Sequence, residues 1–140
     1  MKTWIIYALI SMVFAGFTSV IAKLGLTGIS GELGLAVRTG FVFVFVLAFA
    51  VAVIPSSQLS TLGRSNYIWL GLSGVTTAVS WVFYYKAIKD GQVSTVALID
   101  KGSVVVSVLL AAFILKEQIT VRTLTGAALM VAGLLVIARK

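Results

Sequence analysis

Apolar residues fall in five long blocks that fill almost the whole chain, and short polar turns separate the blocks. A helix needs about 20 apolar residues to cross a bilayer core about 30 Å thick. Each block is close to that length, and lipid leaves only helices to satisfy the backbone of so short a chain. We therefore predict an all-α membrane protein, a single domain over residues 1–140, with transmembrane helices at 4–22, 32–54, 67–86, 93–115 and 119–138.

The composition excludes several classes of function. The chain is 60% hydrophobic and contains neither cysteine nor histidine. These absences exclude disulfides, Cys/His metal sites and imidazole catalysis. We predict that the protein is not an enzyme and has no catalytic residues, no metal site and no cofactor. The net charge of +7 does not indicate nucleic-acid binding, because the basic residues lie at helix ends, where topology and anionic lipids account for them.

The basic residues are divided almost equally between the two sides of the membrane. Five helices place the termini on opposite sides, and a fixed orientation needs an excess of Lys and Arg on one side. The N-terminal side carries Lys2, Arg64, Lys116 and Arg122, and the other side carries Lys23, Lys86, Lys89, Arg139 and Lys140. Such a chain could insert both ways and form an antiparallel homodimer, as inverted transporter repeats do. The alternative is a weak bias that the insertion machinery resolves into one orientation.

Three charged residues lie inside the predicted helices. Arg38 is in the second helix, and Asp100 and Lys101 are in the fourth. A charge at membrane depth costs about 2.5–3.5 kcal/mol on insertion scales, and it normally faces a partner or a water-filled cavity. Adjacent residues on a helix do not face each other. We therefore expect Asp100 to pair with Arg38 or Lys23 on another helix, and Lys101 to point elsewhere.

These charges share one half of the predicted helices with several aromatic residues, which predicts a polar, aromatic-lined site for a small-molecule solute. Its cations would attract an anionic or zwitterionic solute, and Asp100 is the candidate proton-exchanging group. The candidate substrate-binding or coupling residues are Arg38, Asp100, Lys101, Lys23, Trp81, Tyr84 and Tyr85. The alternative for the charges is a structural ion-pair network with snorkelling lysines, and the alternative for the aromatic residues is anchoring at the membrane interface.

The last predicted helix carries a face of small residues. Gly126 and Gly133 are seven residues apart, so they lie on one face two helical turns from each other. Small residues let helix backbones approach closely in lipid. We predict that these glycines make a helix-packing contact, either with a second copy of the chain or with the chain's own helices.

Short motifs follow one another in a specific order along the chain. They are Lys23-Leu24-Gly25-Leu26, Arg38, Trp81, Tyr85-Lys86-Ala87, Gly91, Val96-Ala97, Asp100-Lys101, Ser103, Lys116-Glu117-Gln118-Ile119-Thr120, Gly126-Ala127-Ala128-Leu129 and Gly133. Together they resemble the EamA domain, the repeat unit of the drug/metabolite transporter superfamily, over nearly the whole chain. Family members often have a proline before the Asp-Lys pair, where this chain has Ile99, so we expect a straighter fourth helix.

The resemblance implies a five-helix, one-domain branch of this family. Most members carry two such domains of opposite orientation in one chain, which implies that two copies of this chain assemble. We predict a secondary transporter of small organic solutes or metabolites in the plasma (inner) membrane of a prokaryote, working as a homodimer by alternating access. Two other hypotheses stay open: a half-transporter that needs a different partner chain, and a non-transporting membrane scaffold or sensor.

Overall fold

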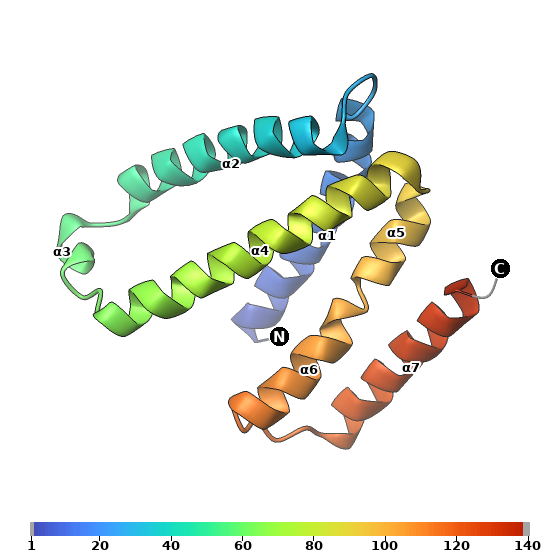
Figure 1. The fold of residues 1–140 in the computed structure, drawn as a ribbon. Coiled ribbons are helices and arrows are strands. Elements are labelled where there is room, and N and C mark those ends of the chain that lie inside the picture. Colours follow the sequence, from blue (N-terminus) through green and yellow to red (C-terminus); the bar gives the residue numbers. More distant parts are fainter. Residues whose placement is uncertain (1, 139–140) are drawn as a thin grey trace. The chain divides into compact units, whose positions relative to one another are not determined.

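The structure is a computed structural model that describes residues 2–138, and these residues form seven α-helices (Figure 1). The helices are α1 (Thr3–Gly25), α2 (Gly31–Val53), α3 (Ser56–Leu59), α4 (Arg64–Asp90), α5 (Val93–Asp100), α6 (Ser103–Ile114) and α7 (Val121–Ala138). The prediction of an all-helical protein is confirmed. Arg139 and Lys140, which entered the charge balance, lie outside the described residues.

Four of the predicted blocks correspond to one helix each, and the block at 93–115 is divided into α5 and α6. The helix predicted there is therefore interrupted at residues 101–102. The polar loop after Pro55 contains the short helix α3, and α4 is longer than the predicted 67–86 at both ends, since it begins at Arg64 and ends at Asp90.

Three stretches are long and apolar enough to cross a membrane: Thr3–Gly25, Gly31–Val53 and Val93–Ile114. The apolar part of α7, Val121–Ile137, is shorter. Helix α4 is 27 residues long but carries more polar side chains. Some of these polar side chains, Ser73 and Thr77 among them, line a cavity that α4 shares with α2.

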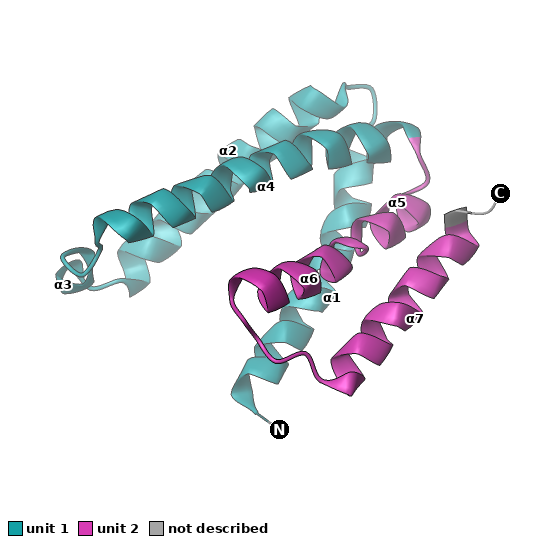
Figure 2. Cartoon of the chain, turned by 60° about the horizontal axis from the view of Figure 1, so that its bottom comes forward, with its two compact units in different colours: residues 1–90 teal, residues 91–140 magenta. Residues whose placement is uncertain are grey.

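The chain divides into two compact units, residues 1–90 and residues 91–140, shown in teal and magenta in Figure 2. In the first unit, α2 and α4 lie side by side. In the second unit, α6 and α7 form a helical hairpin, and α5 also contacts α7. The prediction of a single five-helix domain over residues 1–140 stays a prediction.

The C-terminal end of α1, the N-terminal end of α2 and the C-terminal end of α4 meet in the first unit, and we call this region the convergent end. The buried apolar side chains of the described chain, Leu26, Tyr85 and Ile88, all lie here. Gly31 at the start of α2 is also buried, and a Cβ atom there would lie 3.0 Å from the backbone oxygen of Tyr85. The backbones of α2 and α4 therefore approach closely at this point, and a side chain at Gly31 would have to displace the backbone of Tyr85.

Away from the convergent end, large apolar side chains are exposed on every long helix. Phe45 in α2, Phe113 in α6 and Val121 in α7 are 72%, 80% and 80% exposed. A soluble protein rarely exposes apolar surface over such lengths. These helices therefore present their side chains to lipid or to another chain.

Candidate binding site

Lys23 caps the end of another helix. Its Nζ donates hydrogen bonds of 2.5 and 2.8 Å to the backbone oxygens of Ile88 and Lys89, the last turn of α4. The last carbonyls of a helix have no partner within the helix and carry the negative end of its dipole, so a cation is favoured there. The structure thus gives this candidate site residue a cross-helix capping contact.

Lys89 makes the reciprocal contact. Its Nζ donates a 2.9 Å hydrogen bond to the backbone oxygen of Leu26, which follows the last residue of α1. Each of the two helices α1 and α4 therefore has its C-terminal end capped by a lysine of the other. A salt bridge of 3.2 Å between Lys86 and Glu32 adds a contact from α4 to α2, with both side chains more than half exposed.

Arg38 lies over two aromatic rings. Its guanidinium carbon is 4.2 Å from the ring centroid of Trp81 and 5.9 Å from that of Tyr85. Both distances are within the range of a cation–π interaction. The structure thus brings three of the predicted site residues, one from α2 and two from α4, into one cluster.

One nitrogen of Arg38, Nη1, is buried and has no hydrogen-bond partner among residues 2–138. Buried polar groups in proteins are almost always hydrogen-bonded, and an unsatisfied donor on a charged group is costly. The π face of Trp81 stabilises the cation but accepts no conventional hydrogen bond. Arg38 therefore has an unused donor.

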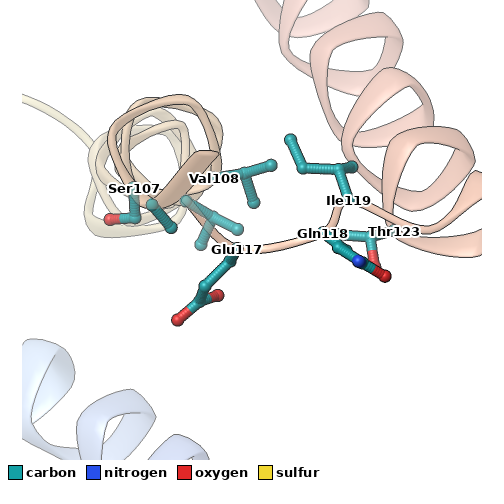
Figure 3. Close-up of a pocket in the computed structure, with 8 residues that line it drawn as sticks. Ser107, Val108, Glu117, Gln118, Ile119 and Thr123 are labelled. Carbon is teal, nitrogen blue, oxygen red and sulfur yellow. The ribbon is translucent and has the colours of Figure 1, made fainter. Parts of the chain in front are cut away.

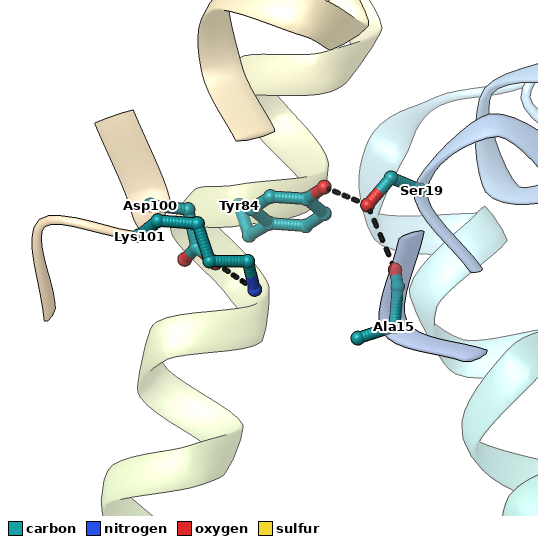
Figure 4. A network of polar contacts seen from close by, with 5 residues as sticks. All are labelled: Ala15, Ser19, Tyr84, Asp100 and Lys101. Carbon is teal, nitrogen blue, oxygen red and sulfur yellow. Dashed lines mark hydrogen bonds and ion pairs between the residues drawn. The ribbon is translucent and has the colours of Figure 1, made fainter. Parts of the chain in front are cut away.

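Tyr84 holds α4 to α1. Its hydroxyl donates a 2.7 Å hydrogen bond to Oγ of Ser19, and that Oγ donates to the backbone oxygen of Ala15 at 3.3 Å (Figure 4). The rings of Tyr84 and Tyr85 meet edge to face, with centroids 6.4 Å apart. This contact orients Tyr85, and with it one wall of the Arg38 cluster.

A cavity of about 500 Å³ lies beside Arg38. Its walls come from α1, α2 and the C-terminal part of α4, and they are mostly apolar. The polar groups in the lining are the guanidinium of Arg38 and the hydroxyls of Thr18 and Tyr85. The apolar lining includes Ile21, Leu26, Ile29, Val37, Phe41, Val42 and Phe45.

A second cavity of about 500 Å³ lies between α2 and α4, with Trp81 in its lining. It also contains the hydroxyls of Thr39, Ser73 and Thr77, two of which bond to carbonyls of their own helix. Because Arg38 lines the first cavity and Trp81 lines the second, their stack stands at the boundary between the two cavities. This stack is the centre of the candidate site in the first unit.

In the second unit, Asp100 and Lys101 lie where the helix is interrupted. Helix α5 ends at Asp100, and the N–H groups of Gly102, Val104 and Val105 donate to carbonyls three residues earlier instead of four. We call residues 100–102 the α5–α6 break. The helix is thus interrupted without a proline, at the polar run Asp100-Lys101-Gly102.

The side chains of Asp100 and Lys101 form an ion pair with an N–O distance of 3.6 Å (Figure 4). The expectation that Lys101 points away from Asp100 is therefore wrong. The rule that helical neighbours diverge does not hold at the α5–α6 break, where the backbone leaves the regular helix. The two side chains are 38% and 53% exposed, so the pair is only partly buried.

Gly102 also permits close packing within the second unit. A Cβ atom there would lie 2.9 Å from the backbone oxygen of Ile99 and 2.9 Å from Cδ1 of Leu134 in α7. By contrast, a Cβ atom at Gly126 or Gly133 would meet nothing within 4 Å in this unit. The helix-packing face predicted on α7 is therefore not used by the hairpin of α6 and α7.

The second unit has a cavity of its own, about 310 Å³, at the turn between α6 and α7 (Figure 3). Its polar lining consists of Ser107, Glu117, Gln118 and Thr123, and the rest is apolar. The turn is shaped by a positive φ of 54° at Lys116, and Thr120 accepts a 3.2 Å hydrogen bond from the N–H of Thr123 at the start of α7. No sequence pattern predicted this cavity.

The comparisons with known proteins agree with the resemblance seen in the sequence. Residues 2–139 match the EamA-like transporter family. The chain belongs to this family. An uncharacterized transporter in the cobO 3′ region of Sinorhizobium sp. is 31% identical over 137 residues, which are 98% of this chain and 97% of the relative. No solved structure matches the chain.

This EamA-like chain is thus a multi-pass membrane protein of a transporter family. Sequence reasoning found the Arg38 cluster but missed Lys89, Gly31 and Gly102. A signal for Lys89 was present, because basic residues in the last turn of a helix often cap carbonyls. No local signal marks the two glycines, since the atoms that crowd them come partly from other helices.

Proposed function

We propose that the chain is a secondary transporter of small organic solutes and works as a dimer by alternating access. The observation that carries this proposal is the Arg38–Trp81 stack between two cavities, in a membrane protein of a transporter family. Transporter sites commonly lie between helices near the middle of the membrane, and a charged residue at depth marks them. The five predicted transmembrane helices and a prokaryotic plasma membrane belong to the same proposal.

The way α2 and α4 pack supports alternating access. Their backbones touch at the convergent end, and a cavity separates them farther along. A helix pair that is fixed at one end can rock at the other with little loss of contact, and rigid-body rocking is a common form of alternating access. The lysine caps hold the convergent end together while the cavity changes.

A second copy of the chain completes the proposed transporter. The nearly equal division of basic residues suits a chain that inserts in both orientations. The open face at Gly126 and Gly133 offers a close helix contact to the second copy. The proposed assembly is an antiparallel homodimer.

Topology is the first test of this proposal. The chain has no native cysteine, so single cysteines placed at Lys2, Ser60 and Lys140 can be labelled from outside intact cells. Labelling of about half the molecules at each position is the result expected from an antiparallel homodimer. All-or-none labelling would instead favour a half-transporter with a different, oppositely inserted partner chain.

Transport is the second test. Purified protein in liposomes is assayed with labelled amino acids, small monocarboxylates and tetraphenylphosphonium, and saturable uptake that is accelerated by unlabelled solute on the opposite side is expected for at least one of them. A folded, dimeric protein that moves none of these probes would contradict the transporter proposal and favour a scaffold or sensor.

A further inference from the structure

We infer that the cavity beside Arg38 binds a small solute through its carboxylate, with Arg38 as the anchor and an apolar body of the solute against α1 and α2. This inference rests on the proposed transport function, because it names the class of solute that the transporter would carry.

The guanidinium of Arg38 needs an anion that the first unit does not supply. Residues 1–90 contain two acids, Glu32 and Asp90. Glu32 pairs with Lys86 at 3.2 Å, and Asp90 is the last residue of α4. Nη1 of Arg38 is buried without a hydrogen-bond partner among residues 2–138. An oxyanion in the neighbouring cavity would accept this hydrogen bond and neutralise the charge.

The stack on Trp81 fixes how that anion would be held. With its carbon 4.2 Å from the Trp81 centroid, the guanidinium lies against an aromatic ring, and its planar array of N–H groups is held in one orientation. A planar carboxylate accepts two parallel hydrogen bonds from such an array. Trp81 and Tyr85 thus act as positioning residues for Arg38.

The rest of the cavity selects the body of the solute. A volume of about 500 Å³ lies within the usual range of small-molecule sites, about 300–1,000 Å³. The lining beyond Arg38 is apolar, with Phe41 and Phe45 on α2 and Ile21 on α1. No carboxylate lines this cavity, so it offers no counter-ion for an amine. The arrangement fits a monocarboxylate with an aromatic or branched aliphatic body.

Binding can be measured without transport by using Trp81 as the reporter. The chain has three tryptophans, and Trp4→Phe with Trp69→Phe leaves Trp81 alone. The full chain is placed in nanodiscs of zwitterionic phosphatidylcholine and titrated at pH 7 with 3-phenylpropionate, 3-phenylpropionamide and 3-phenylpropylamine. We expect the carboxylate to change the Trp81 emission saturably, and the amide and the amine to bind at least about tenfold more weakly.

Arg38→Lys tests the anchor, since lysine keeps the charge but lacks the planar array of donors. Its affinity for 3-phenylpropionate is expected to fall at least about tenfold. Arg64→Lys, at the first residue of α4 and outside the cavity lining, is the matched control and should bind as the parent does. Equal binding of the three probes, or unchanged binding by Arg38→Lys, would overturn the inference. If Arg38→Lys does not fold, the relative affinities of the parent protein for the three probes still test whether the cavity prefers a carboxylate.

Two further experiments test whether a lipid phosphate or the Asp100 carboxylate, instead of a solute, binds Arg38. In nanodiscs containing phosphatidylglycerol, loss of all probe binding would mean that Arg38 holds a lipid phosphate and would overturn the inference. A large gain of probe affinity in Asp100→Asn would mean that Asp100 already occupies Arg38 and would also overturn it; we expect no gain. Carboxylate binding without any flux would contradict only the transport proposal, whereas flux of other solutes without carboxylate binding would contradict only this inference.

Discussion

The convergent end of the first unit and the α5–α6 break of the second unit satisfy their charges in different ways. At the convergent end, Lys23 and Lys89 donate to backbone oxygens of another helix over 2.5–2.9 Å. At the break, Lys101 faces its own neighbour Asp100 at 3.6 Å, and both side chains are partly exposed. The first arrangement joins separate helices, whereas the ion pair of the second links two consecutive residues of one turn. A lysine that contacts another helix can therefore hold the fold together, whereas one paired with its neighbour in the chain does not link separate helices.

Both regions also depend on a glycine, and Gly31 should be the more sensitive of the two. An alanine Cβ at Gly31 would lie 3.0 and 3.1 Å from the backbone oxygen and carbon of Tyr85, and 3.3 Å from the nitrogen of Lys86. Backbone atoms cannot move aside unless α2 and α4 separate. We expect Gly31→Ala to destabilise the protein by about 1–3 kcal/mol, measured by thermal unfolding in detergent.

The matched control for this prediction is Gly16→Ala in α1, where a Cβ atom would meet nothing within 4 Å. Alanine is the better helix former, so this variant should be unchanged or more stable by about 0.5–1 kcal/mol. Similar losses at Gly31 and Gly16 would show that the backbones of α2 and α4 do not touch.

Gly102→Ala should have the second largest effect. Its Cβ would lie 2.9 Å from the oxygen of Ile99 and 2.9 Å from Cδ1 of Leu134. Ile99 belongs to the same turn and the Leu134 side chain is flexible, so part of the clash can relax. We expect a loss of about 1–2 kcal/mol in the same unfolding assay. Gly16→Ala again serves as the control, because a Cβ atom there would meet nothing within 4 Å, and a loss at Gly16 as large as that of Gly102→Ala would contradict the prediction.

Gly31 and Gly102 are examples of structural features that the sequence alone did not predict. The apolar blocks predicted the helices because a bilayer constrains the length and composition of a transmembrane helix. The position of Arg38 inside a helix predicted that its charge faces a partner or a cavity. The α5–α6 break was not predicted, because the absence of a proline in residues 93–115 was given more weight than the polar run Asp100-Lys101-Gly102-Ser103. The close packing of Gly102 at this break could not be predicted, because its neighbour Leu134 is on another helix. The lysine caps depend on partners more than 60 residues away in the chain.

The lysine caps give the third prediction. Lys23 donates to two carbonyls of α4, and Lys89 donates to one carbonyl at the end of α1. A part-buried carbonyl that loses its donor costs about 1–3 kcal/mol. We expect Lys23→Met and Lys89→Met both to lower the unfolding temperature, with the larger decrease for Lys23→Met.

Lys86→Met is the control for the two cap variants, because its salt bridge to Glu32 is largely exposed and such pairs contribute little. If Lys86→Met lowered the unfolding temperature as much as Lys23→Met, a general effect of lost positive charge would explain all three variants. The capping role would then be wrong.

The smallest effect is expected at the α5–α6 break. A double-mutant cycle with Asp100→Asn and Lys101→Gln isolates the interaction of the pair, and a partly exposed ion pair should couple by no more than about 1 kcal/mol. The same cycle with Asp100→Asn and Arg38→Gln tests the pairing that the sequence favours. A buried charge that loses its partner costs about 3–5 kcal/mol, so a true Asp100–Arg38 pair would couple far more strongly. The cycle with the larger coupling therefore identifies the partner of Asp100. If that partner is Arg38, the donor assigned to a solute carboxylate is already occupied by the chain itself.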